Sequence, residues 1–227
     1  MQTMDAVGGR IHRVSPTFPP QTLKEILRDA KPFTAEGHFL YPADENGNHT
    51  QGFFALEPVT RHPPFVDAIA DDMAAWARRE GIDVDLLFAP AQPAVRPLAD
   101  AFAKRLRRPV AYWEYLPSGR FGDRLVESWI PKGSKVLAFN GVSLQGRCVG
   151  LRLPQFVERL GGNVDAAAVF AKGVADLVQE TERRLGARFY STIQVEIPIY
   201  PPAACPICAD THAAPIPWTK FVEGGRP

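Results

Sequence analysis

The sequence predicts an α/β fold with a central, mostly parallel sheet covered by helices on both faces. Apolar runs of strand length alternate along the chain with helical patterns of roughly ten to eighteen residues, as in successive strand–helix–strand units. The chain has 227 residues, enough for one such domain with a small appendage. Many of the 22 prolines fall between the periodic segments and mark their boundaries.

Helices are expected where apolar residues recur at three- and four-residue spacing. These segments are 21–30, 63–80, 93–106, 148–160 and 173–185. The helix at 63–80 has the clearest ends, because proline fits its first turn and Gly81 follows its last.

Strands are expected at 33–41, 51–56, 84–89, 110–115, 135–139, 164–170 and 188–199. The first two flank a predicted turn at 44–48. Because crossovers between parallel strands are right-handed, the loops after Ala89, Tyr115 and Phe139 should lie along one edge of the sheet. We expect the functional site at that edge.

Charge and composition exclude several classes of partner. Lys and Arg number 26 against 25 Asp and Glu, and no extended basic run indicates nucleic-acid binding. The basic cluster at 104–108 is interpreted as a solvated helix end, with a binding patch as the alternative. No apolar run approaches the ~18 residues of a membrane span, and the start of the chain has no secretory pattern. Three cysteines argue against a disulfide framework, so we expect a cytoplasmic protein.

The segment that follows the apolar run at 135–139 is the strongest functional signal. A small, polar turn leads into a helical pattern, and strand, tight loop and helix together point backbone N–H groups at an anion, usually a phosphate. The residues that we expect to contact it are Asn140, Gly141, Ser143, Leu144, Gln145, Gly146 and Arg147. The alternatives are a plain tight turn at Asn140-Gly141 and a solvated residue at Arg147.

This segment resembles the phosphoribosyl diphosphate (PRPP) loop of type I phosphoribosyltransferases. In that family four apolar residues are followed by two acids, two variable or small residues and Thr-Thr-Gly. Here Asn140 and Gly141 stand at the positions of the two acids, and Gly146 matches the glycine. Over residues 21–172 the order of parts looks like orotate phosphoribosyltransferase, which implies a phosphoribosyltransferase-type fold.

Three further segments carry the resemblance. Residues 47–56 are similar to the family's early segment, a turn leading to an aromatic strand. The diphosphate loop corresponds to 90–96, where alanine and proline replace glycine and Gln92 is the polar candidate. The mobile flap corresponds to 118–124, whose two glycines, Arg120 and Arg124 would let it close over an anion.

The resemblance implies a glycosyltransferase that moves phosphoribose between PRPP and a nitrogenous base with Mg²⁺. Losing a charge-assisted hydrogen bond costs roughly 1.5–3 kcal/mol, so two missing acids correspond to about two to four decades in rate or affinity. We therefore expect a phosphoribosyltransferase-like protein that binds PRPP or a nucleotide, with Mg²⁺ only if it is catalytic. The alternative is a non-catalytic nucleotide-sensing or interaction protein on the same fold. We expect a homodimer.

A cysteine motif near the end of the chain is the second strong feature. Cys205 and Cys208 form a C-P-x-C turn, and His212 lies four residues on, so three zinc ligands fall within eight residues. The fourth ligand is open between Cys148, Asp210, another histidine and a group from a second subunit. A pair of reduced thiols and a redox pair are the other interpretations.

We accordingly divide the chain into a phosphoribosyltransferase-like domain at 1–200 and a C-terminal extension at 201–227 that bears the zinc knuckle. His38 alternates with apolar residues, and we interpret it as structural. His49, in the glycine-bearing turn, is interpreted as a surface hairpin residue or as a ligand contact.

Overall fold

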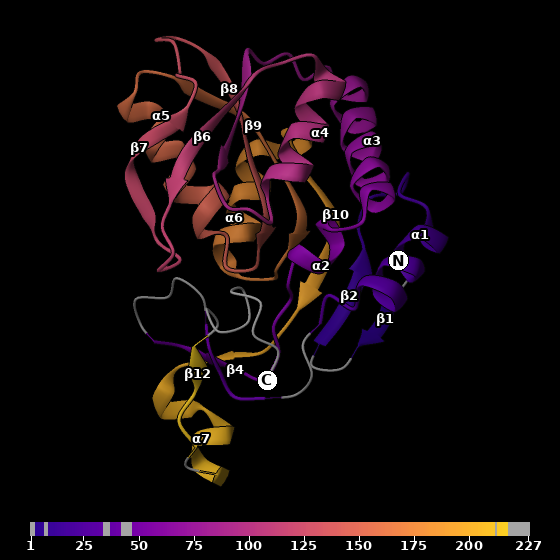
Figure 1. The fold of residues 1–227 in the computed structure, drawn as a ribbon, viewed down its shortest axis with the longest axis vertical. Coiled ribbons are helices and arrows are strands. Elements are labelled where there is room, and N and C mark those ends of the chain that lie inside the picture. Colours follow the sequence, from indigo (N-terminus) through magenta and orange to yellow (C-terminus); the bar gives the residue numbers. More distant parts are fainter. Residues whose placement is uncertain (1–2, 7–8, 34–36, 42–46, 212, 218–227) are drawn as a thin grey trace.

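A computed structural model describes residues 3–6, 9–33, 37–41, 47–211 and 213–217. An eight-stranded sheet, in the order β1-β2-β10-β9-β8-β5-β6-β7, forms its centre (Figure 1). The strands of this sheet are β1 (Thr3–Ala6), β2 (Gly9–Arg13), β5 (Leu86–Pro90), β6 (Val110–Tyr115), β7 (Phe121–Glu127), β8 (Lys135–Ser143), β9 (Asn163–Lys172) and β10 (Phe189–Glu196).

Helices cover the sheet on both faces (Figure 1). They are α1 (Pro20–Glu25), η1 (Ile26–Ala30), α2 (Glu57–Thr60), α3 (Pro63–Arg79), α4 (Arg96–Leu106), η2 (Cys148–Arg152), α5 (Leu153–Arg159), α6 (Asp176–Leu185) and η3 (Gly186–Arg188). In the described part of the chain, no helix has both the length and the apolar character of a membrane span.

The five central strands, β10, β9, β8, β5 and β6, pair in parallel. The edges are antiparallel, with β7 beside β6 and the β1–β2 pair beside β10. The predicted α/β class and mostly parallel sheet are therefore confirmed.

Alternation along the central strands builds two cores. In β8, Leu137 and Phe139 belong to the larger core, which α1, α3 and α4 cover. Val136 and Ala138 point to the opposite core, which α5 covers. Burial on both faces explains why these strands appear in the sequence as continuous apolar runs.

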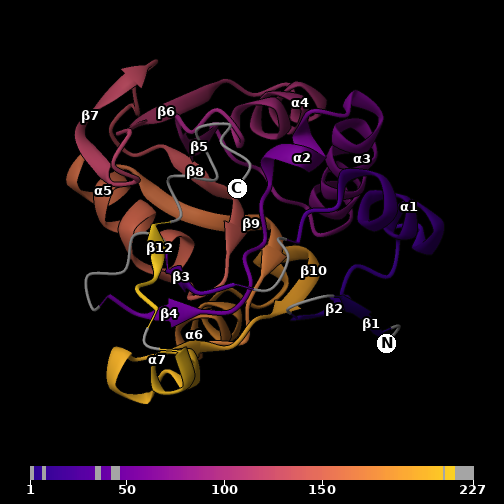
Figure 2. The ribbon, with the colours of Figure 1, turned by 60° about the horizontal axis from the view of Figure 1, so that its bottom comes forward.

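A second, four-stranded sheet lies beyond the C-terminal ends of the parallel strands (Figures 1 and 2). Its order is β11-β4-β3-β12, and the C-terminal strand pairs in parallel with β3. Its strands and the adjoining helices are β3 (Phe39–Leu40), β4 (His49–Thr50), β11 (Ile199–Tyr200), η4 (Pro202–Ala204), α7 (Pro206–Thr211) and β12 (Ile216–Pro217). The described C-terminal segment thus returns to the hairpin of β3 and β4.

The strands expected at 33–41 and 51–56 are wrong in extent. Among the described residues, the two-residue β3 lies within the first range and β4 lies directly before the second, with an isolated bridge between Phe33 and Phe54. Their partner strands β11 and β12 are equally short, because prolines bound or end them and proline lacks a ladder N–H donor. Residues 44–46 of the predicted turn lie outside the described residues.

Other boundaries also shift. The expected helices at 21–30 and 148–160 form, but each contains a π-helical turn, at η1 and η2. The helix expected at 173–185 begins at Asp176, and the strand expected at 188–199 divides into β10 and β11. The sequence pattern did not predict strands β1, β2 and β7. These strands form by pairing with a neighbouring strand of the sheet, which a local pattern does not reveal.

A buried carboxylate joins the helical layer to the sheet. Asp72 in α3 is 6% exposed and accepts hydrogen bonds from the hydroxyls of Tyr190 in β10 and Thr17. Trp76, one turn further along α3, packs on the Tyr190 ring at a centroid distance of 5.1 Å. A buried acceptor of this kind is costly to leave without its donors.

We predict that Tyr190→Phe lowers the free energy of unfolding by about 1–3 kcal/mol, because Asp72 loses a donor. Urea denaturation measures the change. Tyr200→Phe, at a half-exposed tyrosine of β11, is the matched control and should change stability by less than about 0.5 kcal/mol. Equal changes in the two variants would show that the hydrogen bond from Tyr190 to Asp72 does not contribute to the free energy of unfolding.

Candidate functional site

A cavity of about 200 Å³ lies at the C-terminal ends of β5, β6 and β8. Its walls come from the sheet edge, the β6–β7 hairpin, and the segment around the small sheet, including Tyr41 and residues 53–57. That volume is more than ten times the ~10–15 Å³ that one water needs. The cavity therefore has room for a small organic ligand.

The structure brings most of the predicted site residues to this cavity. Those that line it are Gln92, Asn140, Ser143, Leu144, Gln145, Gly146 and Arg147. Three predicted residues, Gly141, Arg120 and Arg124, are not among the described residues that line it. Contact of any of the ten with a ligand stays a prediction.

Strand β8 extends four residues further than expected, to Ser143. Asn140, Val142 and Ser143 pair with Val169, Ala171 and Lys172 of β9. The interpretation of Asn140-Gly141 as a tight turn is therefore wrong, because the parallel ladder continues through these residues. The turn occupies residues 144–146, directly before the helical segment that begins near Arg147.

Two glycines fix the position of this turn. Gly146 has φ +76°, and a Cβ there would lie 2.7 Å from the backbone nitrogen of Val178 in α6. A Cβ on Gly173, after β9, would lie 1.9 Å from the carbonyl oxygen of Leu144. The Gly173 N–H also donates to the carbonyl of Ser143 at 3.1 Å. The turn is therefore held between the end of β9 and the start of α6.

Neither acid position of the family pattern has a group that is free to reach a ligand: the Asn140 amide is bonded to its own strand, and Gly141 has no side chain. The Asn140 amide accepts from the Gly141 N–H at 2.8 Å and donates to the Val142 carbonyl at 3.0 Å. A Cβ on Gly141 would lie 2.0 Å from Cδ2 of Leu56, which is buried. At the second acid position, Leu56 thus occupies the space that a side chain on residue 141 would need.

Polar groups at the cavity favour an anion. The Ser143 hydroxyl is buried and has no hydrogen-bond partner among the described residues. Arg147 and Arg152 line the cavity, and the one acid among the described lining residues, Glu57, pairs with Arg61 at 2.7 Å. The described lining residues thus include two arginines and one acid.

The predicted flap is an antiparallel hairpin held by aromatic packing. Trp113 stacks on Phe121 at 4.3 Å, packs on Phe156 at 4.2 Å, and donates to the Gly122 carbonyl at 2.9 Å. The cavity wall from this hairpin consists of Tyr115, Gly119 and Phe121.

The two flap arginines lie elsewhere. Arg124 is exposed and pairs with Glu114 at 3.0 Å. Arg120 is exposed directly before β7. The hairpin therefore presents aromatic side chains to the cavity in this conformation.

Two ionisable groups beside the cavity stay neutral near pH 7. Burial raises the pKa of the Tyr115 phenol to about 12. Burial likewise raises the pKa of the Cys148 thiol to about 12, although Asn140 and Arg152 act in the opposite direction. Cys148 is therefore not a thiolate nucleophile here.

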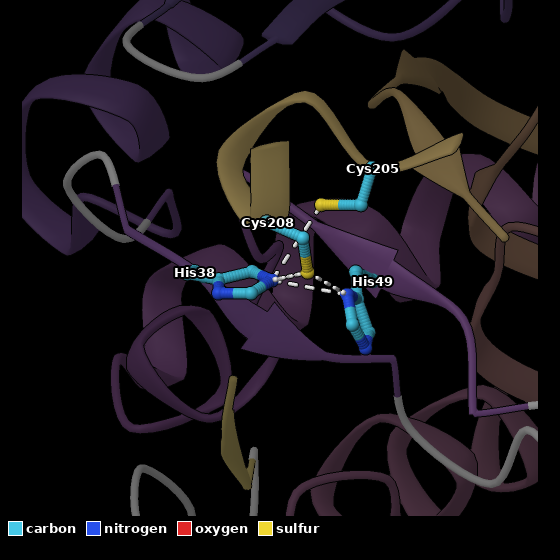
Figure 3. Close-up of side chains that lie close together, drawn as sticks. All are labelled: His38, His49, Cys205 and Cys208. Carbon is cyan, nitrogen blue, oxygen red and sulfur yellow. Dashed lines mark hydrogen bonds between the residues drawn. The ribbon is translucent and has the colours of Figure 1, made fainter. Parts of the chain in front are cut away.

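A second group of chemically capable side chains lies in the small sheet (Figure 3). His38, directly before β3, and His49 in β4 face Cys205 and Cys208 at the start of α7. One nitrogen or sulfur atom from each lies within 4.8 Å of all the others. His38, His49 and Cys205 are buried, and Cys208 is half-buried.

This arrangement changes the ligand set that the sequence predicts. Cys205 and Cys208 do come together, but their partners among the described residues are two histidines from the hairpin. The interpretation of His49 as a surface histidine is wrong, since it is 7% exposed. His212 lies outside the described residues, and neither Cys148 nor Asp210 belongs to the group.

Protonation in this group follows from burial. Burial, and then the neighbouring His38, lower the pKa of His49, which favours the neutral imidazole at pH 7. Burial, and then Cys205, raise the pKa of Cys208 in the metal-free arrangement.

Several cavity residues had only an indirect signal in the sequence. Phe54 lies within 47–56, which resembles the family's early segment, and Tyr41 and Phe54 fall in expected strands, but neither they nor Glu57 were expected at the site. Arg152 follows the turn within η2 and looked like an ordinary helix residue.

No family model matches this chain. Curated relatives named orotate phosphoribosyltransferase do match it. The one from Campylobacter concisus is 27% identical over 207 residues, covering 87% of this chain and 98% of the relative. The one from Thermococcus gammatolerans is 26% identical over 159 residues, covering 70% and 79%.

Solved structures agree. Orotate phosphoribosyltransferase from Aeropyrum pernix superposes with a TM-score of 0.55 at 19% identity, covering 75% of this chain and 92% of that one. The Mycobacterium tuberculosis enzyme in complex with inorganic phosphate gives a TM-score of 0.55 at 18% identity, covering 77% and 95%. The phosphoribosyltransferase-type fold and the resemblance to this family are confirmed.

The packing around Gly141 gives a stability prediction. Gly141→Asp should lower the melting temperature by several degrees, because its Cβ would overlap Leu56. In a double-mutant cycle with Leu56→Ala, the two changes should cost less together than their sum, since the smaller residue provides space. Strict additivity, measured by chemical denaturation, would contradict the contact.

Proposed function

We propose that this protein binds a phosphorylated ribose, as PRPP or a nucleotide, in the cavity at the C-terminal ends of β5, β6 and β8. The observation that carries the proposal is the turn from β8 into the helix, where Ser143 and Arg147 line the cavity and the buried Ser143 hydroxyl has no hydrogen-bond partner among the described residues. The phosphoribosyltransferase-type fold and the names of the relatives support the same ligand class.

The cavity suggests how such a ligand would lie. The phosphate would rest at the 143–147 turn, where the Ser143 hydroxyl donates and the Arg147 guanidinium offsets the charge. The other end of the ligand would lie near Tyr115, Phe121 and Phe54, which also line the cavity. Aromatic side chains suit a planar ring.

Mg²⁺, which the family resemblance implies, does not fit the residues present. The ion prefers several oxygen ligands, usually including one or two carboxylates. Among the described residues that line the cavity, the carboxylate is that of Glu57, which pairs with Arg61. Asn140 uses its amide within the strand, and Gly141 faces Leu56. We therefore derive no step through a metal at this cavity.

Binding without Mg²⁺-assisted turnover follows, so we favour a nucleotide-sensing or interaction role. Transfer of phosphoribose to a nitrogenous base is the second candidate, because Gly119 and Phe121 of the hairpin border the cavity and the relatives are named as transferases. Release of diphosphate from PRPP with a panel of bases distinguishes the two roles, and robust release would establish transfer. A homodimer and a cytoplasmic location stay predictions.

We predict that Arg147→Ala weakens binding of ribose 5-phosphate, PRPP or a nucleoside monophosphate roughly ten- to a hundredfold, because a charge-assisted contact worth about 1.5–3 kcal/mol is lost. Isothermal titration calorimetry measures the dissociation constants. Arg78→Ala, an exposed arginine on α3, is the control and should bind like the wild type.

Two results would contradict this proposal. One is the absence of binding of all these phosphates to the folded wild-type protein at millimolar concentration. The other is an unchanged dissociation constant in Arg147→Ala, which would place the phosphate elsewhere.

A further inference from the structure

We propose that His38, His49, Cys205 and Cys208 bind one structural zinc ion that fastens the C-terminal segment to the β3–β4 hairpin. The site is separate from the cavity described above, and none of its four ligands lines that cavity. The proposal rests on three independent features of the group, which are its interatomic distances, the orientation of one imidazole, and the exposure of the segment that it would hold.

Four of the six distances between the ligand atoms are close to the edges of a tetrahedron around zinc, and all of these atoms lie within 4.8 Å of one another. With Zn–S bonds of ~2.3 Å and Zn–N bonds of ~2.1 Å, a tetrahedron has S···N edges of about 3.6 Å and an N···N edge of about 3.4 Å. Here Nε2 of His38 lies 3.5 Å from both sulfur atoms, and Nδ1 of His49 lies 3.3 Å from Sγ of Cys208. The two histidine nitrogens are 3.0 Å apart. Small outward shifts would complete the geometry.

The orientation of His38 shows which of its nitrogens faces the group. Its Nδ1 lies 2.7 Å from the carbonyl oxygen of Ala213, and a carbonyl can only accept, so Nδ1 carries the hydrogen. In the neutral imidazole, the Nε2 lone pair then faces His49, Cys205 and Cys208 at once (Figure 3). One lone pair cannot satisfy three neighbours by hydrogen bonding, whereas a cation at the centre satisfies all four groups. A backbone carbonyl behind a ligating histidine is also the usual support of a metal site.

The donor set selects the ion. Two thiolates and two imidazoles in a tetrahedral arrangement are typical of zinc, whereas magnesium and calcium require oxygen ligands. Four protein ligands close the coordination shell and leave no position for a reactive water. The ion is therefore structural rather than catalytic.

The C-terminal segment has few buried contacts of its own that could hold it in place. Among the described residues from 201 to 211, Cys205 is the one buried residue, and β12 is exposed. A segment with so little apolar burial gains its order from other contacts, here a two-residue strand pairing and the proposed metal. Tyr41, which follows β3, lines the cavity. The proposed metal site would therefore also stabilise the segment that forms one wall of the cavity.

The test is the metal content of the full-length protein purified without chelator. We expect about one zinc per chain by elemental analysis. His38→Ala, His49→Ala and the double variant with Cys205→Ser and Cys208→Ser should each lose it. Cys148→Ser and His62→Ala control for other thiols and imidazoles and should keep it. His212→Ala should also keep it, because four ligands are already present.

Two further measurements use wild-type protein, so that a variant that fails to fold does not decide the outcome. Cobalt added after chelation should give the intense visible absorption of a tetrahedral thiolate site. Chelation should also speed proteolytic cleavage within 198–217, and zinc should restore protection.

Several outcomes would overturn the proposal. They are less than about 0.1 zinc per chain with no tetrahedral cobalt spectrum, a Cys205–Cys208 disulfide in the purified protein, and full zinc content in the histidine variants. Loss of zinc in His212→Ala together with its retention in His49→Ala would show that His212, as the sequence motif indicates, is a ligand and that His49 is not. These outcomes do not depend on whether the cavity binds a phosphate.

Discussion

The turn at residues 144–146 depends on two glycines whose missing side chains let three backbone segments meet. Gly173 admits the Leu144 carbonyl, and Gly146 admits the backbone at the start of α6. This close approach sets where β8 stops and the helix at Arg147 begins. The floor of the cavity, the burial of the Ser143 hydroxyl and the place of Arg147 at the cavity all follow from it.

The chemistry of the cavity follows from the residues just before that turn. Because β8 continues through Asn140 and Gly141, both residues belong to the sheet, and Leu56 lies against Gly141. No carboxylate from this part of the chain faces the cavity, while Arg147 and Arg152 do line it. A cavity whose described lining includes two arginines and one acid, Glu57, suits an anionic ligand held by hydrogen bonds and arginine.

The sequence was sufficient for the parallel sheet, because strands buried on both faces are continuously apolar and helices separate them. It was insufficient wherever a segment takes its structure from contact with a segment far away in the sequence. Asn140 and Ser143 are polar and looked like a turn, yet β9 lies beside them and extends the strand. The C-P-x-C turn is local and therefore visible, whereas His38 and His49 join it only because the C-terminal segment returns to the hairpin. Spacing along one sequence contains no information about that return.

The central claim is that this scaffold holds a phosphorylated ribose through its turn and arginine rather than through a metal. The most direct measurement is the dissociation constant of PRPP by calorimetry, with and without Mg²⁺. The account predicts binding that changes by less than about threefold on adding Mg²⁺, a free-energy difference under about 0.7 kcal/mol. Binding that appears only with Mg²⁺, or strengthens tenfold or more, would contradict it.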